Sequence, residues 1–331
     1  MRVVSFGEIM LRLSPPGVER LFQSPQLRTY FGGAEANVAA SLARLGVDSV
    51  YVSRVPDNPI GEAALNELRS CGVDTTHVLK GGARLGSYFV EYGSDVRAMR
   101  VVYDRAGSAF SEIDATAIAW DDVLHGASWL HVSGITPALG AGAGASALTA
   151  VQRARSLGVK VSFDLNYRAQ LWHGRDPRSL IMPFAKTSDL LIGNAGAITA
   201  MLGIGAADAR PVSDDVAREM AHAVHAETGS ARVVVTRRDS RSASQHGWCA
   251  SLLNGDTGAY YESRHYQVEV TDRVGGGDAC AAGLLFALVR GRADRDVLEY
   301  GVAAGAIKLT INGDFSRATD AEIEKLMQEP R

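Results

Sequence analysis

The chain has 331 residues, of which 46% are hydrophobic and 21% are charged, and its formal net charge is -3. This is the composition of a globular protein that can bury a sizeable core, and it lacks the basic excess of proteins that bind nucleic acid. The three cysteines follow no metal-ligand spacing, and no apolar stretch is long enough to span a bilayer. We therefore expect a cytoplasmic protein with small-molecule ligands, and neither nucleic acid nor a membrane as partner.

Strands and helices alternate along the first seventy residues. The expected elements are a strand at 3–10 that leaves through a turn at 12–16, a helix opened by Gly32 and Gly33, a strand at 48–54, and a helix from Asn58 to about Ser70. Val38, Leu42 and Leu45 share one face of the first helix. Gly46 is placed to end that helix, and Pro59 stands near the start of the second.

A different pattern interrupts this alternation at 78–103. Residues 87–92 and 97–103 alternate apolar and polar side chains, and the Gly-Ser-Asp segment at 93–95 is typical of a hairpin turn. A hairpin inserted into an alternating α/β chain predicts a separate small sheet, and such sheets can act as lids over active sites. We expect the lid to be formed by about 12–32 and 78–110.

The rest of the chain returns to alternating strands and helices. Strands are expected at 129–133, 159–164, 190–192 and 233–236, helices near 147–156, 178–185, 196–202 and 213–227, edge strands within 260–270, and final helices near 295–310 and 318–327. Continuous β-branched strands separated by helices predict a mostly parallel sheet covered on both faces. Ligands of such sheets bind at the carboxyl ends of the strands, where residues 164–168 fall.

The stretch at 272–278, DRVGGGD, directly before an apolar run at 279–288, carries the clearest chemical signal. Gly275, Gly276 and Gly277 allow a tight turn whose N–H groups face one concavity, and the following helix adds its positive dipole end. Asp278 is placed to take a proton from a hydroxyl that attacks a bound phosphoryl group. The alternative is an ordinary helix start capped by an aspartate. The spacing excludes a Walker A loop and the dinucleotide-binding glycine motif.

A second entry from glycines into a helix lies at 30–39. Gly32 and Gly33 permit close approach of a small molecule to the backbone at the helix N-terminus, and Asn37 offers both a donor and an acceptor. The alternative for this segment is a tight turn without a ligand.

The two glycine motifs together carry a resemblance to a known family. Phe31-Gly32-Gly33-Ala34-x-Ala36-Asn37-Val38-Ala39 resembles the sugar-side signature of the ribokinase-like (PfkB) carbohydrate kinases, and 272–283 resembles their nucleotide-side signature. The resemblance covers essentially the whole length, 1–331, as a single domain. It implies a three-layer α/β/α fold with a mostly parallel central sheet and a small β-sheet lid, ATP as donor, Mg²⁺, and a primary hydroxyl as acceptor. Asp278 then corresponds to the base, and the Gly275, Gly276 and Gly277 amides to the anion hole.

Within this family the chain looks most similar to kinases of 2-keto-3-deoxygluconate, because 103–109 and 166–168 resemble segments that hold an acidic sugar there. The implied reaction is phosphorylation of the 6-hydroxyl, which gives 2-keto-3-deoxy-6-phosphogluconate. Arginine binds a carboxylate bidentately, which suits Arg105 and Arg168, although either can equally be a solvated or ion-paired arginine. The implied substrate-binding residues are Gly33, Asn37, Tyr88, Tyr103, Arg105, Arg168, Asp278 and Asp314.

The implied nucleotide-binding residues are Asn166, Asn194, Thr236, Arg238, Gly275, Gly277 and Val302. Two segments depart from the family pattern. Asn194 is followed by Ala-Gly-Ala where the family usually has an acidic residue that organises Mg²⁺, so only an indirect role in metal binding is expected of Asn194. Residues 237–244 contain no glycine where a Gly-x-x-Gly turn is common, and Arg237 and Arg238 there meet either ATP phosphates or solvent.

Two other functions stay open at this point. One is a kinase of a neutral sugar or nucleoside such as fructose, ribose or adenosine, and the other is a catalytically weak sensor that binds a sugar acid. An exposed apolar face on the lid sheet would favour a homo-oligomer through the lid.

Overall fold

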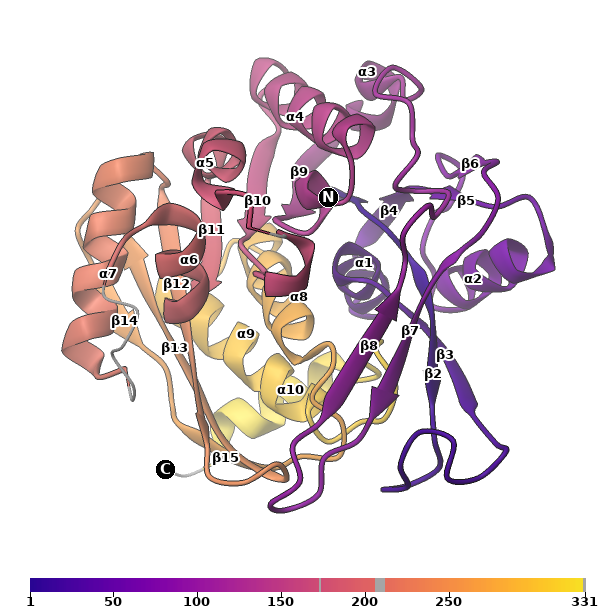
Figure 1. The fold of residues 1–331 in the computed structure, drawn as a ribbon. Coiled ribbons are helices and arrows are strands. Elements are labelled where there is room, and N and C mark those ends of the chain that lie inside the picture. Colours follow the sequence, from indigo (N-terminus) through magenta and orange to yellow (C-terminus); the bar gives the residue numbers. More distant parts are fainter. Residues whose placement is uncertain (173, 206–211, 330–331) are drawn as a thin grey trace.

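The computed structural model describes residues 1–172, 174–205 and 212–329 (Figure 1). A nine-stranded sheet runs through its centre in the order β14-β13-β12-β11-β10-β9-β1-β4, with β15 also paired to β13. The strands are β1 (Arg2–Phe6), β4 (Asp48–Val52), β9 (Ala127–Ser133), β10 (Lys160–Asp164), β11 (Leu190–Asn194), β12 (Arg232–Ser240), β13 (Gln245–Asn254), β14 (Tyr260–Glu262) and β15 (Tyr266–Glu269). From β4 to β12 all neighbours are parallel, and β13 to β15 form an antiparallel edge. The predicted mostly parallel sheet is confirmed.

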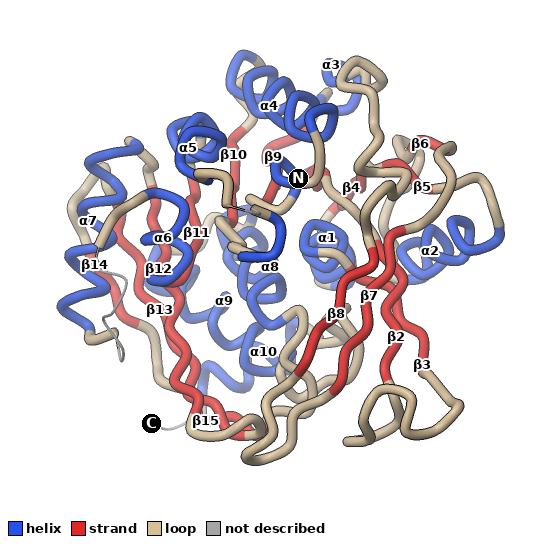
Figure 2. The backbone as a smooth tube through the Cα atoms, viewed as in Figure 1, coloured by secondary structure: helices blue, strands red, loops and turns tan. Residues whose placement is uncertain are grey.

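Helices cover both faces of this sheet (Figure 2). One layer contains α3 (Trp120–Leu124), α4 (Ala141–Ser156), α5 (Pro177–Thr187), α6 (Ala195–Leu202) and α7 (Asp214–Thr228); the other contains α1 (Ala34–Arg44), α8 (Gly276–Val289), α9 (Asp294–Lys308) and α10 (Asp320–Gln328). Successive strand residues serve opposite layers, since Val4 and Phe6 pack with the first and Val3 with the second. The predicted three-layer α/β/α architecture is therefore present.

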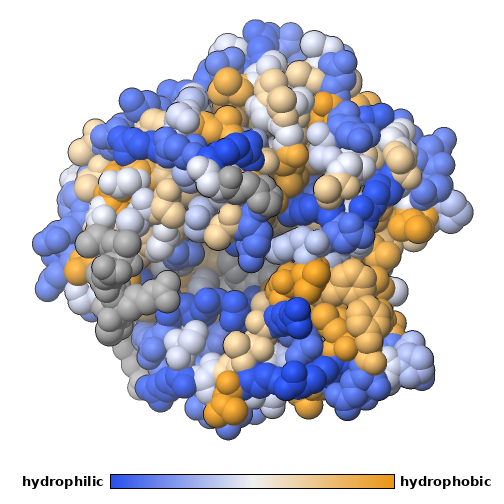
Figure 3. Space-filling view, in the orientation of Figure 1, coloured by the Kyte–Doolittle hydropathy of each residue, from blue (hydrophilic) through white to orange (hydrophobic). Residues whose placement is uncertain are grey.

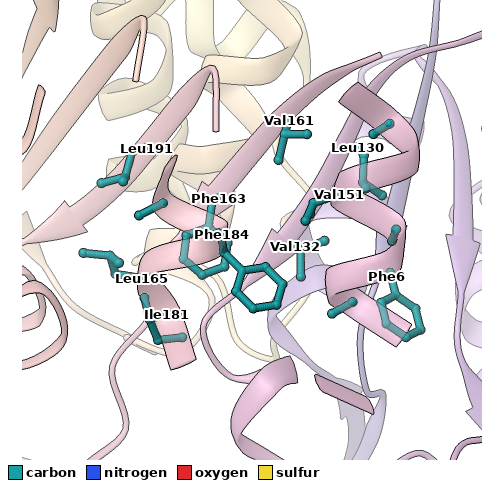
Figure 4. Close-up of a cluster of buried hydrophobic side chains, with 14 of the residues drawn as sticks. Phe6, Leu130, Val132, Val151, Val161, Phe163, Leu165, Ile181, Phe184 and Leu191 are labelled. Atoms are coloured by element: carbon teal, nitrogen blue, oxygen red, sulfur yellow. The ribbon is translucent and has the colours of Figure 1, made fainter. Parts of the chain in front are cut away.

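The core of the first layer shows how strands and helices interlock (Figure 4). Phe163 of β10 stacks on Phe184 of α5, with ring centroids 5.4 Å apart. Val132 of β9 and Val151 of α4 belong to the same cluster and are fully buried. Burial of such side chains contributes roughly 1.5–3 kcal/mol each, and it fixes the carboxyl ends of β9 and β10 in place.

A separate four-stranded sheet, called here the small sheet, has the order β3-β2-β7-β8. Its strands are β2 (Met10–Ser14), β3 (Arg28–Gly32), β7 (Gly86–Glu91) and β8 (Arg100–Asp104). Met10, Tyr88 and Val90 are buried on its inner face. The predicted hairpin is confirmed as β7 and β8, which pair antiparallel. Helix α2 (Pro59–Ser70) lies nearby and has the predicted bounds, and Asn58 caps its N-terminus.

The predicted turn at 12–16 is wrong, because residues 10–14 form β2. The predicted strand at 3–10 is accordingly two strands, β1 and β2, separated at Gly7 to Ile9. The cause is Arg12, whose charge favours an exposed turn but whose side chain is fully buried against carboxylates from the far end of the chain. A polar residue whose partners are distant in sequence gives no local sign that it is buried.

Several elements were not predicted at all. They are β13, α3, the short strand β6 (Leu79–Lys80), and two short 3₁₀ turns at Thr136–Ala138 and Ala169–Leu171. The partner of β6, β5 (Arg54–Val55), is separate from β4, although the predicted strand at 48–54 ran on to its first residue. Strand β13 was not predicted because its residues from His246 to Leu253 are buried on both faces, so the sequence shows no alternation of apolar and polar residues there. In the described ranges no helix has both the length and the apolar character needed to cross a membrane.

The small sheet touches the main body at the tip of its hairpin and at its base. At the tip, the backbone N–H of Ala243, in the turn between β12 and β13, donates to the carbonyl of Asp95 at 2.8 Å. Between these contacts the surface is hollowed, and apolar side chains gather over the small sheet beside the hollow (Figure 3). The small sheet therefore stands over the carboxyl-end side of the main sheet.

Candidate active site

The N-terminus of α8 forms an open cradle of backbone N–H groups. Gly275 precedes the helix with φ of 82°, in the left-handed region, and a Cβ there would overlap the Asp314 carbonyl oxygen. Among the described residues no side chain caps this helix, whose first residues are Gly276 and Gly277. Gly277 is exposed, and a Cβ on it would meet no atom of the described chain within 4 Å. Uncapped N–H groups at the positive end of a helix dipole are a site for an anion.

Asp278 lies in the first turn of α8, and its carboxylate accepts hydrogen bonds from side chains instead of capping the helix. Asn37 donates from Nδ2 to Asp278 Oδ2 at 2.6 Å, and Asn166 donates from Nδ2 to Oδ1 at 3.3 Å. Burial raises the pKa of Asp278 to about 6, while the hydrogen bond from Asn37 and the positive charge of Arg168 act in the opposite direction. A carboxylate with this pKa can accept a proton near neutral pH.

The first glycine motif meets the second at Asn37. Gly33 stands at the N-terminus of α1, is buried, and donates its N–H to Asn37 Oδ1 at 3.3 Å. A Cβ on Gly33 would overlap the carbonyl oxygen of Glu8, so glycine is required for this close approach. The N-termini of α1 and α8 therefore converge on the same carboxylate.

A second carboxylate, Asp164, lies at the carboxyl end of β10. Asn166 donates its backbone N–H to Asp164 Oδ1 at 3.0 Å and its side-chain amide to Oδ2 at 3.4 Å. The same amide reaches Asp278, so Asn166 links the two carboxylates, with its backbone at a φ of 41°. Burial, followed by the charge of Asp278, raises the pKa of Asp164 to about 7. The sequence placed this segment at a strand end but gave Asp164 no role.

Two arginines add positive charge next to these carboxylates. Arg168 donates from Nη1 to the Tyr167 carbonyl at 3.1 Å, and its charge favours the ionised forms of Asp164 and Asp278. The pKa of Arg273 is lowered by burial and then by the charge of Arg168. Within the described ranges neither arginine lies within ion-pair distance of a carboxylate. Two such like charges attract an anionic ligand.

Arg105 differs from this pair because it already has an internal carboxylate. Its Nε donates to Glu8 Oε2 at 2.9 Å, Nη2 donates to the same oxygen, and Ser108 donates to Glu8 Oε1. The guanidinium also lies 5.6 Å from the ring centroid of Tyr103. The expected substrate-binding arginine is thus fixed and partly neutralised by Glu8, which the sequence had not singled out.

Tyr88 and Asp314 form the floor beneath the small sheet. The Tyr88 hydroxyl donates to Asp314, and Arg12 donates to the other carboxylate oxygen at 2.6 Å. Tyr103 stacks on Tyr88 with centroids 5.8 Å apart. Asp314 also fills the space where a Cβ of Gly32 would lie, and it is almost fully buried. Its observed contacts lie beneath the site, with Tyr88 and Arg12.

The expected nucleotide-binding residues fall into two places. Asn194 and Thr236 are register partners at the ends of β11 and β12. Asn194 caps α6 by accepting from the Ala197 N–H at 3.0 Å. Val302 is fully buried, and its carbonyl accepts a hydrogen bond from Trp248 Nε1 at 3.1 Å. The structure therefore places Val302 in the core.

The two arginines after Thr236 have different surroundings. Arg238 lies further along β12, opposite Trp248 and exposed. Arg237 forms an ion pair with Asp214 of α7. Arg237 is therefore engaged with the protein itself, which was neither of the two expectations for it.

Sequence reasoning missed the buried polar residues around the site. They are Glu8, Arg12, Glu35, Asp164, Asp272 and Lys308, together with the half-buried Arg273. Glu35 illustrates the missing signal, since it accepts the Ser133 N–H at 2.9 Å and the Thr136 hydroxyl at 2.7 Å, both about a hundred residues away. Only the positions of Glu35 within one glycine motif and of Asp272 at the start of the other marked them for attention.

Comparisons with known proteins agree with this geometry. The sequence of residues 1–319 matches the protein-family model described as "pfkB family carbohydrate kinase". A relative named 2-dehydro-3-deoxygalactonokinase, from Haloferax volcanii, is 34% identical over 326 residues, which are 98% of this chain and 96% of the relative. The crystal structure of 2-dehydro-3-deoxygluconokinase from Thermotoga maritima is 40% identical, with a TM-score of 0.95, and the match covers 99% of this chain and 100% of that chain.

A more distant structure shares the fold alone. A protein named ribokinase II, from E. coli and solved in complex with ATP and Mg²⁺, is 20% identical with a TM-score of 0.83. The match covers 99% of each chain, so the sheet, both helix layers and the small sheet have counterparts there.

Proposed function

Because the chain belongs to the pfkB family of carbohydrate kinases, we propose that it transfers the γ-phosphoryl group of ATP to the 6-hydroxyl of 2-keto-3-deoxygluconate, also written 2-dehydro-3-deoxygluconate. The products are ADP and 2-keto-3-deoxy-6-phosphogluconate. The observation that carries the proposal is the Asp278 carboxylate, held by Asn37 beside the uncapped N-terminus of α8. A base beside an anion hole is what phosphoryl transfer to an alcohol requires.

In the proposed reaction the acceptor hydroxyl gives its proton to Asp278. Its oxygen forms a bond to the γ-phosphorus as the bond from that phosphorus to the bridging oxygen of ADP breaks. The Gly275, Gly276 and Gly277 amides meet the charge on the transferred group. Catalysis then consists mainly of holding the two reactants in line and excluding water.

The acidic acceptor is supported by the names of both close relatives and by the charges of the site. Arg168 and Arg273 supply positive charge that no protein carboxylate within the described residues neutralises at ion-pair distance. We assign Arg168 to the acceptor carboxylate, and Arg105, in the fixed position that Glu8 imposes, to the acceptor end under the small sheet. Gly33 and Tyr103 complete this end of the site. The gluconate and galactonate epimers differ at one hydroxyl, and the assay below separates them.

ATP is the donor of this kinase family, and the site fits Mg²⁺ as its companion. No three His, Cys, Asp or Glu side chains converge in the part of the chain that the structure describes. Mg²⁺ needs few protein ligands because it keeps several waters and binds the phosphates directly. Asp164 is a buried carboxylate whose raised pKa a cation would lower, and we assign it to the metal through water in place of the acidic residue missing after Asn194. When bound, Mg²⁺ neutralises phosphate charge.

We further propose that the small sheet is the lid of this site and pairs with a second copy. Its inner face covers the acceptor end through Tyr88 and Tyr103. On its outer face Val102 is 40% exposed, and Phe22, in the loop between β2 and β3, is 73% exposed with its ring centroid 6.1 Å from that of Phe89. An exposed apolar sheet face of this kind is typical of an interaction surface.

The deciding experiment is a coupled assay of ADP release with ATP and Mg²⁺. The acceptor panel is 2-keto-3-deoxygluconate, its galactonate epimer, gluconate, fructose, ribose and adenosine, with Asp278→Asn as the control enzyme. We expect turnover with the keto-deoxy acids and a loss of about 10²- to 10⁴-fold in kcat for Asp278→Asn, with nucleotide binding retained. Preference for fructose, ribose or adenosine would replace the acidic acceptor by a neutral one. Binding of a sugar acid without turnover would instead make the protein a sensor.

A further inference from the structure

Beneath the site lies a buried cluster of four charges, Arg12, Asp272, Lys308 and Asp314. Arg12 Nη1 donates to Asp314 at 2.6 Å, and Nη2 lies 2.8 Å from Asp272 Oδ2. Lys308 Nζ donates to the carbonyl of Ile311 at 3.0 Å. Two cations thus balance two carboxylates, a balance that charges fully removed from water require.

Each end of the Arg12 guanidinium reaches a different part of the active site. Asp272 begins the glycine loop, and its Oδ1 accepts the Val274 N–H at 3.0 Å, which sets the path of the chain into Gly275. Asp314 accepts the Tyr88 hydroxyl from the small sheet, and its backbone oxygen lies where a Cβ of Gly275 would be. The same guanidinium therefore touches both the root of the phosphate-binding loop and the floor of the acceptor end.

Arg12 itself belongs to the small sheet, where it is the middle residue of β2. Tyr30 of β3 and Tyr92, just after β7, each place a ring centroid 5.3 Å from its guanidinium. The Tyr92 hydroxyl donates to Asp272 at 3.2 Å. A displacement of the small sheet cannot leave Arg12 behind, because its strand and both tyrosines move with it. Any such displacement must break or carry along the contacts to Asp272 and Asp314.

We propose that Arg12 is a positioning residue that couples the small sheet to the phosphate-binding loop. Nucleotide at the N-terminus of α8 fixes Asp272, Asp272 holds Arg12, and Arg12 holds β2 and the tyrosines over the acceptor. The inference deepens the proposed function and rests on it for the identity of the acceptor. Coupling between two sites is reciprocal, so the acceptor must tighten nucleotide binding by the same factor.

The first test needs only the nucleotide, so it does not depend on the acceptor. Hydrogen–deuterium exchange of 10–14 and 86–104 is measured with and without AMP-PNP and Mg²⁺, in the wild type, Arg12→Met and Arg12→Lys. We expect the nucleotide to slow exchange of these segments in the wild type. In Arg12→Met the nucleotide should still protect the start of α8 but no longer the small sheet, with Arg12→Lys intermediate. Equal protection of the small sheet in all three proteins would overturn the proposal.

The second test measures the coupling factor by calorimetry. AMP-PNP affinity is compared with and without saturating 2-keto-3-deoxygluconate, and we expect tightening of at least about fivefold in the wild type and a factor near one in Arg12→Met. Arg232→Met is the matched control, because it removes another ion pair, to Asp294 at 2.6 Å, away from the site. The control should keep the wild-type factor.

Two further points keep this test decisive. If Arg12→Met does not fold, the double variant Arg12→Met with Asp272→Asn is used in its place. It removes one cation and one carboxylate, so Asp314 is still balanced by Lys308. A wild type that shows no coupling although it phosphorylates the acceptor refutes the role of Arg12 alone. A wild type that phosphorylates no acceptor refutes the proposed function, while the exchange experiment still decides the role of Arg12.

Discussion

Asn37 Nδ2 lies 2.6 Å from Asp278 Oδ2, and this hydrogen bond joins two residues that are 241 positions apart in the chain. The hydrogen bond favours the ionised carboxylate, against burial, which has raised its pKa to about 6. The protonated carboxyl cannot act as a base, so kcat/KM should rise with pH through this range. Because Asp164, with a pKa raised to about 7, is coupled to Asp278, the observed values belong to the pair.

Asn37→Ala should move the acidic limb of the pH profile to higher pH, because the ionised form loses its donor. Losing one hydrogen bond to a charged group, roughly 1.5–3 kcal/mol, corresponds to a displacement of about one to two pH units. The measurement is kcat/KM from pH 5 to 9. Ser41→Ala is the control, since it removes a hydrogen bond to the Asn37 carbonyl on the same helix without touching Asp278. An unshifted limb in Asn37→Ala would show that Asp278 does not control it.

Arg168 and Arg105 should respond differently to substitution. Arg168→Gln removes a guanidinium without a carboxylate at ion-pair distance in the described chain, so stability should change little. KM for the acidic acceptor should rise about 10- to 100-fold, as expected for the loss of a charge-assisted hydrogen bond. An unchanged KM with the sugar acid would contradict the acceptor assignment.

Arg105→Gln should instead destabilise the fold by about 3–5 kcal/mol, because it leaves the buried Glu8 carboxylate without its partner. The double variant Glu8→Gln with Arg105→Gln removes both charges and should recover most of that stability. Denaturant unfolding checks the first expectation. The KM of the double variant then reports any direct contact of Arg105 with the acceptor, free of the stability effect.

Two glycines of the phosphate loop should separate stability from activity. Gly277→Ala places a methyl group in open space in the first turn of α8, so the free energy of unfolding should stay equal or rise by up to about 1 kcal/mol. KM for ATP should nevertheless rise, since that space is the anion cradle. Gly275→Ala should lose stability, by at least about 1–2 kcal/mol, because its φ is 82° and its Cβ would overlap the Asp314 carbonyl. Equal loss of stability in both variants would contradict the cradle.

The apolar outer face of the small sheet predicts self-association. Phe89→Asp places a charge on that face beside Val102, its register partner, and should shift the protein from dimer to monomer in sedimentation velocity at micromolar concentration. Ser70→Asp adds the same charge at an exposed position at the end of α2 and should leave the dimer intact. A monomeric wild type would refute the pairing.

The sequence predicted what periodicity and glycines determine. The alternation of strands and helices gave the mostly parallel sheet with its two covering layers, and the two glycine motifs gave the helix starts that meet at Asp278. Both succeeded because their signals are local: an apolar period, or a backbone turn that needs glycine.

The burial of Arg12, Glu8 and Lys308 was not predicted, because it depends on contacts that are distant in the sequence. A charged residue in a sequence favours the surface, and its burial depends on partners that only the folded chain brings close. Arg105 is a second example. From the sequence, an arginine that binds a ligand carboxylate cannot be distinguished from one that is already paired with a protein carboxylate such as Glu8. The predicted turn at 12–16 is wrong for the same reason, because Arg12 is buried within β2.

The separation of Arg12 from Asp314, 302 residues, also has a consequence for how the protein is made. At roughly 5–20 residues per second, a ribosome needs about 15–60 s to reach Asp314 after it has translated Arg12. Until Asp272 and then Asp314 have been translated, Arg12 on β2 lacks its two carboxylate partners, so the inner face of the small sheet must stay hydrated for most of that interval. The nascent chain can therefore assemble the early strands of the main sheet first, and its ligand-covering layer closes among the last steps of maturation.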